Sequence, residues 1–297
     1  MIIIKLKGGL GNQMFQYAFG KVMSLKNSTQ LYLDTSGYAN AVKMDGFTPR
    51  TYELTIFDSV AEIIDPVKLN KQLYPRKIEK YIRYILGRNT IKYHSPGVGY
   101  DNTAFNIPNN VYYVGYFQSY KYYTNMEDRI KECFKFKQEL LNARTVKTKN
   151  ELTDKHTISV HIRRGDYVTD STTNENHGLC SMEYYNTCID LMMQRVDNPV
   201  FVFFSDDIEW VKNEFGNRNL NSVFIDFNTG SDSWMDLYLM QHCKHNIIAN
   251  SSFSWWGAWL NHNSSKIVCA PNNWFKKKEI DIIDDLIPES WLRIDNA

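Results

Sequence analysis

From residue 157 onward, short apolar segments alternate with amphipathic ones. The apolar segments have the length and composition of buried strands, and in the others apolar residues recur at helical spacing. We predict strands at 157–163, 199–207, 222–227, 245–250 and 266–271, and helices at 181–196, 208–216, 233–243 and 253–262. Because strands that are apolar throughout need cover on both faces, this alternation predicts a parallel, doubly wound sheet of the Rossmann type.

The first half of the chain shows a similar pattern with less regularity. It opens with a β-branched strand at 1–9, a glycine turn and a helix at 11–27. Strands are also expected at 30–36 and 111–119, whereas residues 37–110 mix turn signals without a clear period.

These patterns predict an α/β protein with two domains. A chain of 297 residues is longer than most single cores. A polar stretch near residue 150 marks the boundary, so the first domain spans 1–150 and the second 151–297. We expect the last helix to pack back on the first domain.

Charge and cysteine usage limit the classes of partner. Lys and Arg number 34 against 33 Asp and Glu, so a nucleic-acid partner is not expected. No apolar run is long enough to span a bilayer, which predicts a cytoplasmic protein. The cysteines are odd in number, scattered and without a CxxC pair, which favours free thiols over a disulfide framework or a zinc site. They are Cys133, Cys180, Cys188, Cys243 and Cys269.

The first predicted strand of the second half ends abruptly in charge, with the sequence HIRRGD. Side chains alternate along a strand, so His161 and Arg163 share a face and Arg163 lies at the strand tip. Ligands of doubly wound domains bind beyond the carboxyl ends of the strands, and an arginine fork matches phosphate oxygens. Two arginines against the single Asp166 leave a positive charge, which favours an anionic ligand. The alternative is a structural salt bridge between Arg164 and Asp166.

Polar residues end two further strands. Ser205, Asp206 and Asp207 follow the second strand, where a carboxylate would bind a base or ribose, bind a metal or cap the next helix. The segment 250–254 begins with Asn250 and adds three serines at a helix start, which suits a phosphate or ribose cradle. The tryptophans that follow are expected in the core.

The glycine-rich segment 8–11 near the amino terminus permits close backbone approach at a helix start. It is not the dinucleotide fingerprint, because Met14 stands where a glycine is required and only Asp34 follows the second strand. A simple turn and a ligand loop that includes Asn12 and Gln13 both remain open.

A long polar loop separates the arginines from the next helix. It contains Asp170, Glu175 and His177, and loops longer than a connection needs are often functional. These side chains are candidates for a catalytic base, although a lone loop histidine is more often incidental.

Six motifs spread over nearly the whole chain carry a resemblance. In chain order they are GGLGNQMFQYAFG, HIRRGDY, HGLCSMEYY, FSDDIEWV, NSSFSWWGAWL and CAPNNWF. Together they resemble the bacterial α-1,2-fucosyltransferases of glycosyltransferase family eleven. The HxRRxD element is also similar to one in α-1,6-fucosyltransferases and protein O-fucosyltransferases.

The resemblance implies a GT-B fold of two facing Rossmann-like domains, with the donor held mainly by the second and the acceptor by the first. It implies an inverting, metal-independent transfer of L-fucose from GDP-β-L-fucose to the 2-hydroxyl of a terminal galactose, in a surface polysaccharide or O-antigen. The partners expected are GDP-fucose and this glycan, with peripheral membrane association through a lipid-linked acceptor. No cofactor is expected.

The resemblance also implies roles for single residues. Arg163 matches the arginine that neutralises the leaving diphosphate, and Asp206 the position that reads guanine. With the candidates above, the expected catalytic residues are Arg163, Asp166 and His177. The expected donor-binding residues are Gly9, Asn12, Gln13, His161, Arg163, Arg164, Ser205, Asp206, Asn250, Ser251, Ser252 and Phe253.

Two alternatives remain. One is a glycosyltransferase of the same scaffold that uses another nucleotide sugar. The other is a carbohydrate-binding protein without catalysis, suggested by an aromatic content of 14%. Such a protein needs exposed aromatic platforms and no phosphate cradle, so stabilisation by free GDP would speak against it.

Overall fold

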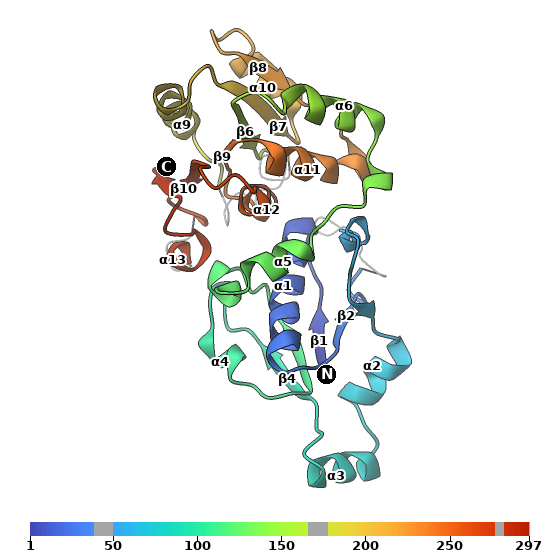
Figure 1. The fold of residues 1–297 in the computed structure, drawn as a ribbon. Helices are drawn as coiled ribbons and strands as arrows, with labels where there is room; N and C mark the ends of the chain where they lie inside the picture. The colour runs from blue at the N-terminus through green and yellow to red at the C-terminus, as the bar shows by residue number, and fades with distance from the viewer. Residues whose placement is uncertain (39–49, 166–177, 277–281, 297) are drawn as a thin grey trace. The chain divides into compact units, whose positions relative to one another are not determined.

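The computed structural model describes residues 1–38, 50–165, 178–276 and 282–296. The chain divides into two compact units between Phe136 and Lys137 (Figure 1). The predicted boundary near residue 150 falls inside helix α6 (Ala143–Leu152), which belongs to the second unit. The sequence of this helix resembles a polar linker because the helix buries only Thr145 and Leu152.

The first unit is built on a five-stranded parallel sheet in the order β3-β2-β1-β5-β4. Helix α1 covers one face so closely that a Cβ added at Gly20 would overlap with Ile4. The other face packs against Leu69 and Leu73 of α2. The strands are β1 (Ile2–Lys5), β2 (Leu31–Asp34), β3 (Glu62–Ile63), β4 (Ile91–His94) and β5 (Val111–Val114). The helices are α1 (Leu10–Lys26), η1 (Leu54–Ile56), α2 (Pro66–Leu73), α3 (Lys77–Ile85), α4 (Asn102–Phe105), η2 (Tyr120–Tyr123) and α5 (Glu127–Glu132).

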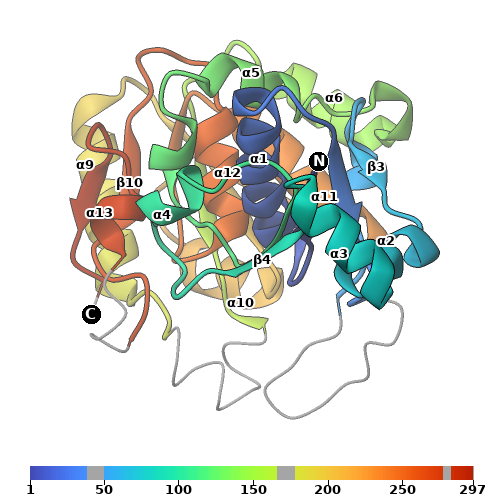
Figure 2. The same cartoon turned by 90° about the horizontal axis from the view of Figure 1, so that it is seen from below.

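Several elements of this unit have no counterpart among the predicted ones. Within the stretch 37–110, which shows no clear period, they are η1, β3, α2, α3, β4 and α4. Helices α2 and α3 bury no residue, and the exposed edge strand β4 is not an apolar run. Figure 2 shows α2 and α3 next to each other at an edge of this unit.

The second unit contains a six-stranded parallel sheet in the order β11-β10-β9-β6-β7-β8. Numbered from its first strand, this is the 3-2-1-4-5-6 order of doubly wound folds, so the predicted Rossmann-like sheet is confirmed. The strands are β6 (Thr157–Ile162), β7 (Val200–Ser205), β8 (Ser222–Phe224), β9 (His245–Ile247), β10 (Val268–Pro271) and β11 (Leu292–Ile294). Besides α6, the helices are η3 (Gln138–Leu140), α9 (Met182–Arg195), α10 (Ile208–Phe215), η4 (Gly230–Asp232), α11 (Trp234–His242), α12 (Ser252–Leu260) and α13 (Ile283–Leu286).

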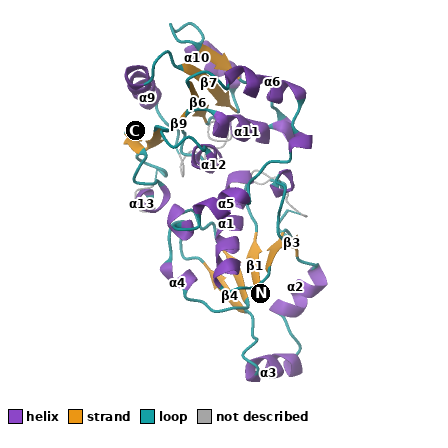
Figure 3. Cartoon of the chain, in the orientation of Figure 1, coloured by secondary structure: helices purple, strands orange, loops and turns teal. Residues whose placement is uncertain are grey.

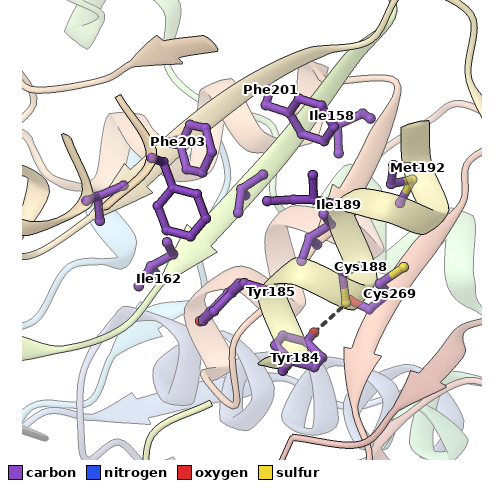
Figure 4. Packing of buried hydrophobic residues seen from close by; sticks show 14 of the residues in the cluster. Ile158, Ile162, Tyr184, Tyr185, Cys188, Ile189, Met192, Phe201, Phe203 and Cys269 are labelled. Carbon is purple, nitrogen blue, oxygen red and sulfur yellow. Dashed lines mark hydrogen bonds between the residues drawn. The ribbon is translucent and has the colours of Figure 1, made fainter. Parts of the chain in front are cut away.

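Helices cover both faces of this sheet (Figure 3). Figure 4 shows Tyr184, Tyr185 and other residues of α9 packed against the inward-facing residues of β6 and β7. The Tyr184 hydroxyl donates to the carbonyl of Ile248 at 2.6 Å, and the Tyr185 hydroxyl to that of His161 at 3.2 Å. These bonds fix α9 to the carboxyl ends of β6 and β9. All five cysteines are free, as predicted.

A buried polar chain joins α6 to α11. The Thr145 hydroxyl donates to Asn228 Oδ1 at 3.0 Å, and Asn228 Nδ2 donates to Asp236 Oδ1 at 2.9 Å. Burial raises the pKa of Asp236 to about 8, against a smaller opposite effect of the bond from Asn228. This carboxyl group therefore retains its proton at neutral pH.

Replacing Asp236 with Asn is expected to remove a pH dependence of stability. The folded protein keeps this proton up to about pH 8, whereas the unfolded chain releases it near pH 4 (about 3.9 for Asp). The free energy of unfolding of the wild type should thus fall as pH rises between these values, by at most about 1.4 kcal/mol per unit. Urea unfolding at several pH values should show a flatter profile for Asp236→Asn and higher stability than wild type at pH 8. Asp190→Asn, at an exposed position of α9, should leave the wild-type profile unchanged.

Candidate functional site

The candidate site lies where the strand order of the second sheet reverses, between β6 and β9. At such a point the connections leave in opposite directions and open a crevice beyond the carboxyl ends of the strands. Arg163 and Arg164 follow β6, and Asn250 and Ser251 follow the end of β9. The structure therefore brings together the two polar strand ends that the sequence predicted to share a ligand.

Each arginine has its own carboxylate. The Arg163 guanidinium lies 2.7 Å from Asp206 Oδ2, and Arg164 Nε lies 3.1 Å from Asp207 Oδ2. The backbone N–H of Arg164 also donates to Asp206. The net positive charge that we expected from two arginines and one aspartate is therefore wrong, because Asp206 and Asp207, which follow β7, supply two further carboxylates. The two guanidinium side chains remain 22% and 20% exposed, so the ion pairs do not remove them from solvent.

Strand register explains these pairs. Ile162 of β6 is paired with Ser205 of β7, so the next residues along each strand, Arg163 and Asp206, emerge side by side. Asp207 also accepts from the N–H of Trp210, which confirms that one of the two aspartates caps α10.

Trp210 was not among the predicted site residues. The Arg164 guanidinium lies over its ring at 3.8 Å from the centroid, a cation–π contact that holds the guanidinium from one side. The spacing Asp207-x-x-Trp210, with the tryptophan in the first turn of a helix capped by the aspartate, is the signal in the sequence.

His161 is buried and lies beside Phe253 of α12, whereas Val160 and Ile162 pack in the core cluster with α9. Its ring centroid lies 5.8 Å from that of Phe253. Burial lowers the pKa of His161 to about 4, with Arg163 acting in the same direction and Asp206 against it, so the imidazole is neutral at pH 7. Within the described part of the chain its buried Nδ1 has no hydrogen-bond partner. A neutral imidazole offers a hydrogen bond to a ligand but no charge.

Of the polar residues after β9, Asn250 holds the fold together, whereas Ser251 and Ser252 lie at the start of α12. The Asn250 amide donates to the carbonyls of Gly178 and Trp274, at 3.2 and 3.3 Å, and holds three chain segments together. Ser251 is the N-cap of α12 but makes no side-chain cap bond, and Ser252 follows it at the helix start. The tryptophans of α12 are buried, as predicted.

The predicted loop residues of the first unit follow β1, where Gly9 is the N-cap of α1 and Asn12 and Gln13 lie in its first turn. Gly8 has a φ of +80°, the left-handed region that favours glycine, and a Cβ there would lie 2.6 Å from the Asn12 amide nitrogen. Asn12 accepts from Gln118 at 2.7 Å. The amide nitrogen of Gln13 donates to the carbonyls of Gly8 and Thr51, and its amide oxygen accepts from the backbone N–H of Glu53. Gln13 therefore shapes the loop that includes Gly9.

Asp34 is occupied within the fold. It accepts from the buried hydroxyl of Tyr112 at 2.7 Å and from the backbone N–H of Ser36. Its carboxylate is thus engaged where a dinucleotide-binding protein would present it to a ribose.

Some predicted residues cannot be placed. Asp166 and His177, with Asp170 and Glu175, lie outside the described residues.

Among the residues described, no group of three or more His, Cys, Asp or Glu side chains is arranged to hold a metal ion. None of the helices in the described ranges is long and apolar enough to cross a membrane.

Replacing Gly165 with Ala is expected to strain the arginine–aspartate pair. A Cβ at this position would overlap with Asp206 Oδ2, the carboxylate oxygen that pairs with Arg163, so this carboxylate must shift. The overlapping atom is the end of a partly exposed side chain that can shift, so the cost in unfolding free energy should be at the low end for overpacking, about 1 kcal/mol. Urea unfolding should show this loss for Gly165→Ala and almost none for the control Gly97→Ala, where a Cβ meets no atom within 4 Å.

A double-mutant cycle checks the cause of this loss. In an Asp206→Ala background the clash disappears, so Gly165→Ala should cost less than in the wild type. An equal cost in both backgrounds would mean that Gly165 acts through another contact.

Comparison with known proteins assigns a family. A family model described as Glycosyl transferase family 11 matches residues 1–294. The alpha-1,2-colitosyltransferase of Escherichia coli is 35% identical over 298 residues, with 99% of each chain covered. The O-antigen biosynthesis glycosyltransferase WbnK of Escherichia coli is 32% identical, covering 97% of this chain and 99% of that protein. A galactoside 2-alpha-L-fucosyltransferase of Caenorhabditis elegans is 26% identical, covering 99% of this chain and 79% of that one.

Solved structures support the fold. Fucosyltransferase NodZ from Bradyrhizobium matches with a TM-score of 0.51 and 14% identity, over 86% of this chain and 92% of that one. At this identity the likeness concerns the fold alone, and it confirms the predicted α/β class of GT-B type, with two parallel sheets. Because the family model spans nearly the whole chain and two relatives above 30% identity align end to end, the chain belongs to glycosyl transferase family 11 and is a glycosyltransferase.

Proposed function

We propose that the protein transfers L-fucose from GDP-β-L-fucose to the 2-hydroxyl of a terminal galactose, with inversion and without a metal ion. The observation that carries the proposal is the pair of ordered arginines at the point where the strand order of the second sheet reverses. Membership of family 11 and the match to a galactoside 2-alpha-L-fucosyltransferase support the choice of sugar and linkage. The acceptor we propose is a surface glycan, since WbnK is named for O-antigen biosynthesis.

The chemistry of the leaving group explains the need for arginines. Breaking the bond between the sugar and the diphosphate builds negative charge on GDP, and fixed cationic donors stabilise this charge more in the transition state than in the ground state. A guanidinium has five N–H donors, so it can hold a carboxylate and phosphate oxygens together. In this proposal Asp206 orients Arg163, and Asp207 and Trp210 orient Arg164.

Neutral groups complete the proposed donor site. The start of α12, with Ser251 and Ser252, offers N–H and hydroxyl donors to the phosphates. The neutral His161 is proposed to donate or accept one hydrogen bond at this site. A reading of guanine by Asp206 stays a prediction, because its described partners are Arg163 and the backbone of Arg164.

The acceptor hydroxyl must also lose a proton, ordinarily to a positioned base. Asp166, Asp170, Glu175 and His177 stay candidates for that base. Proton transfer to the departing phosphate, without a side-chain base, is the alternative.

Replacing Arg163 with Ala tests the proposed role directly. Losing a transition-state donor of this kind should lower kcat/KM for GDP-fucose transfer by about 10²–10³-fold. The control is Arg293→Ala, because Arg293 is also ion-paired in the second unit, with Asp284, and lies on the edge strand β11, two strands from β9. Thermal unfolding should show that both variants fold. Near-normal turnover by Arg163→Ala would refute the assignment.

A second candidate donor is GDP-colitose, favoured by the 35% identity to an alpha-1,2-colitosyltransferase. Colitose is L-fucose without its 3-hydroxyl, so the two donors differ in one polar contact. A site that hydrogen-bonds this hydroxyl should reject the deoxy sugar by about 10²-fold or more, since a buried partner is left unpaired.

Donor preference separates these functions. With a panel of β-galactosides as acceptors, we expect the highest kcat/KM for GDP-fucose among GDP-fucose, GDP-colitose, GDP-mannose and UDP-galactose. Linkage analysis of the product should show the sugar on the 2-hydroxyl of galactose. Turnover of GDP-colitose alone would assign the second function. No turnover of any donor, together with no stabilisation by free GDP, would indicate the carbohydrate-binding alternative.

A further inference from the structure

Helix α3 carries an apolar stripe that no described residue of its own unit buries. Ile78, Tyr81, Ile82 and Ile85 recur at intervals of three and four residues, so they line one face of the helix. Such a face normally packs on a core, yet no residue of α3 is buried, and Ile78 and Ile85 are 76% and 64% exposed.

The stripe continues on neighbouring residues. The other large exposed apolar side chains of this region are Val67, Tyr74, Tyr84, Leu86 and Ile91. Exposed apolar surface of this extent marks an interaction site. The α2–α3 hairpin, defined here as residues 66–92, is therefore built for contact with a partner.

The hairpin is attached in a way that presents α3 outward. Leu69 and Leu73 of α2 pack on the first sheet, which anchors that helix. Arg83 of α3 donates to Gln72 of α2 at 3.0 Å, so α3 is held by its neighbour. Figure 1 shows α3 reached by two chain segments at the end of its unit.

Charge identifies the partner. The hairpin contains eight Lys or Arg residues and one acidic residue, Glu79, which gives it a net charge of +7, while the whole chain carries +1. On α3 itself Lys77, Lys80 and Arg83 lie outside the apolar stripe. Basic residues beside an apolar stripe that contains tyrosine are the pattern of helices that lie in the interface of an anionic bilayer.

Other occupants fit less well. Two copies docked through this face would bring two charges of +7 together, and like-charge juxtaposition opposes association. A nucleic acid would match the charge but leave the isoleucines without an apolar partner. We propose that the α2–α3 hairpin docks the protein on anionic phospholipid, with the stripe of α3 inserted at the level of the headgroups.

This inference is independent of the donor and the linkage proposed above, because vesicle binding needs neither nucleotide nor acceptor. The test is cosedimentation of the full chain with vesicles of phosphatidylcholine alone or mixed with phosphatidylglycerol. We expect binding to the mixed vesicles, weakened by salt, and little binding to phosphatidylcholine alone.

Two pairs of substitutions separate the apolar and electrostatic contributions. Ile78→Glu with Ile85→Glu should lower the partition coefficient at least about tenfold, because both side chains lose their burial in the bilayer. Lys77→Glu with Lys80→Glu should lower it by about fivefold or more for each charge. The matched control is Val146→Glu with Met193→Glu, two exposed apolar residues of the second unit, which should bind as the wild type does. All these positions are exposed, and thermal unfolding checks that the variants fold.

Three outcomes would overturn the proposal. The first is no binding to the mixed vesicles. The second is binding that Ile78→Glu with Ile85→Glu leaves unchanged, which would indicate charge attraction without insertion. The third is a concentration-dependent dimer, seen by analytical ultracentrifugation, that the same two substitutions abolish, which would assign the face to a second copy of this chain.

Discussion

The parallel register between β6 and β7 determines the chemistry of the second unit. It places the guanidinium of Arg163 beside the carboxylate of Asp206, and the same strand end carries Arg164 to Asp207. Both cations are thus oriented before a ligand arrives, so binding an anion costs little further side-chain entropy. A slip of one residue would turn every side chain of β6 to the opposite face and move His161 away from α12. Backbone hydrogen bonds far from solvent therefore set the geometry at the crevice.

Hydrophobic pattern predicted the central strands of the second sheet well because β6, β7 and β10 are almost fully buried and therefore stand out as apolar runs. The same reasoning failed for residues 37–110. Helices α2 and α3 have no buried residues, and β4 is an exposed edge strand, so no core imposes a period on their sequence. The edge strand β11 was missed because its three residues, Leu292–Ile294, include an arginine and form no apolar run. A hydrophobic pattern arises where an element packs on a core, and α2, α3 and β4 bury no residue.

The candidate site was predicted in its location but not in its charge balance. Strand ends rich in polar residues pointed to the crevice, and topology alone brought β6 and β9 together there. The partners of Arg163 and Arg164 depend on the register between strands that lie about forty residues apart, which a single sequence does not reveal. The charge of His161 also depends on burial, which lowers its pKa and keeps the imidazole neutral. The sequence alone does not show this burial, so it would suggest a further cation at the strand end.

The environment of the cysteines has a consequence for the redox chemistry of the protein. Burial raises the pKa of Cys180 and of Cys243 to about 12, and it also raises that of Cys133. Contact with the Cys269 thiol and burial raise the pKa of Cys188. The thiolate is the form that attacks electrophiles and peroxide, so these sulfur atoms are chemically quiet while the units stay folded. Alkylation of the buried Cys133, Cys188 or Cys243 would accordingly report an opening of the core that surrounds it.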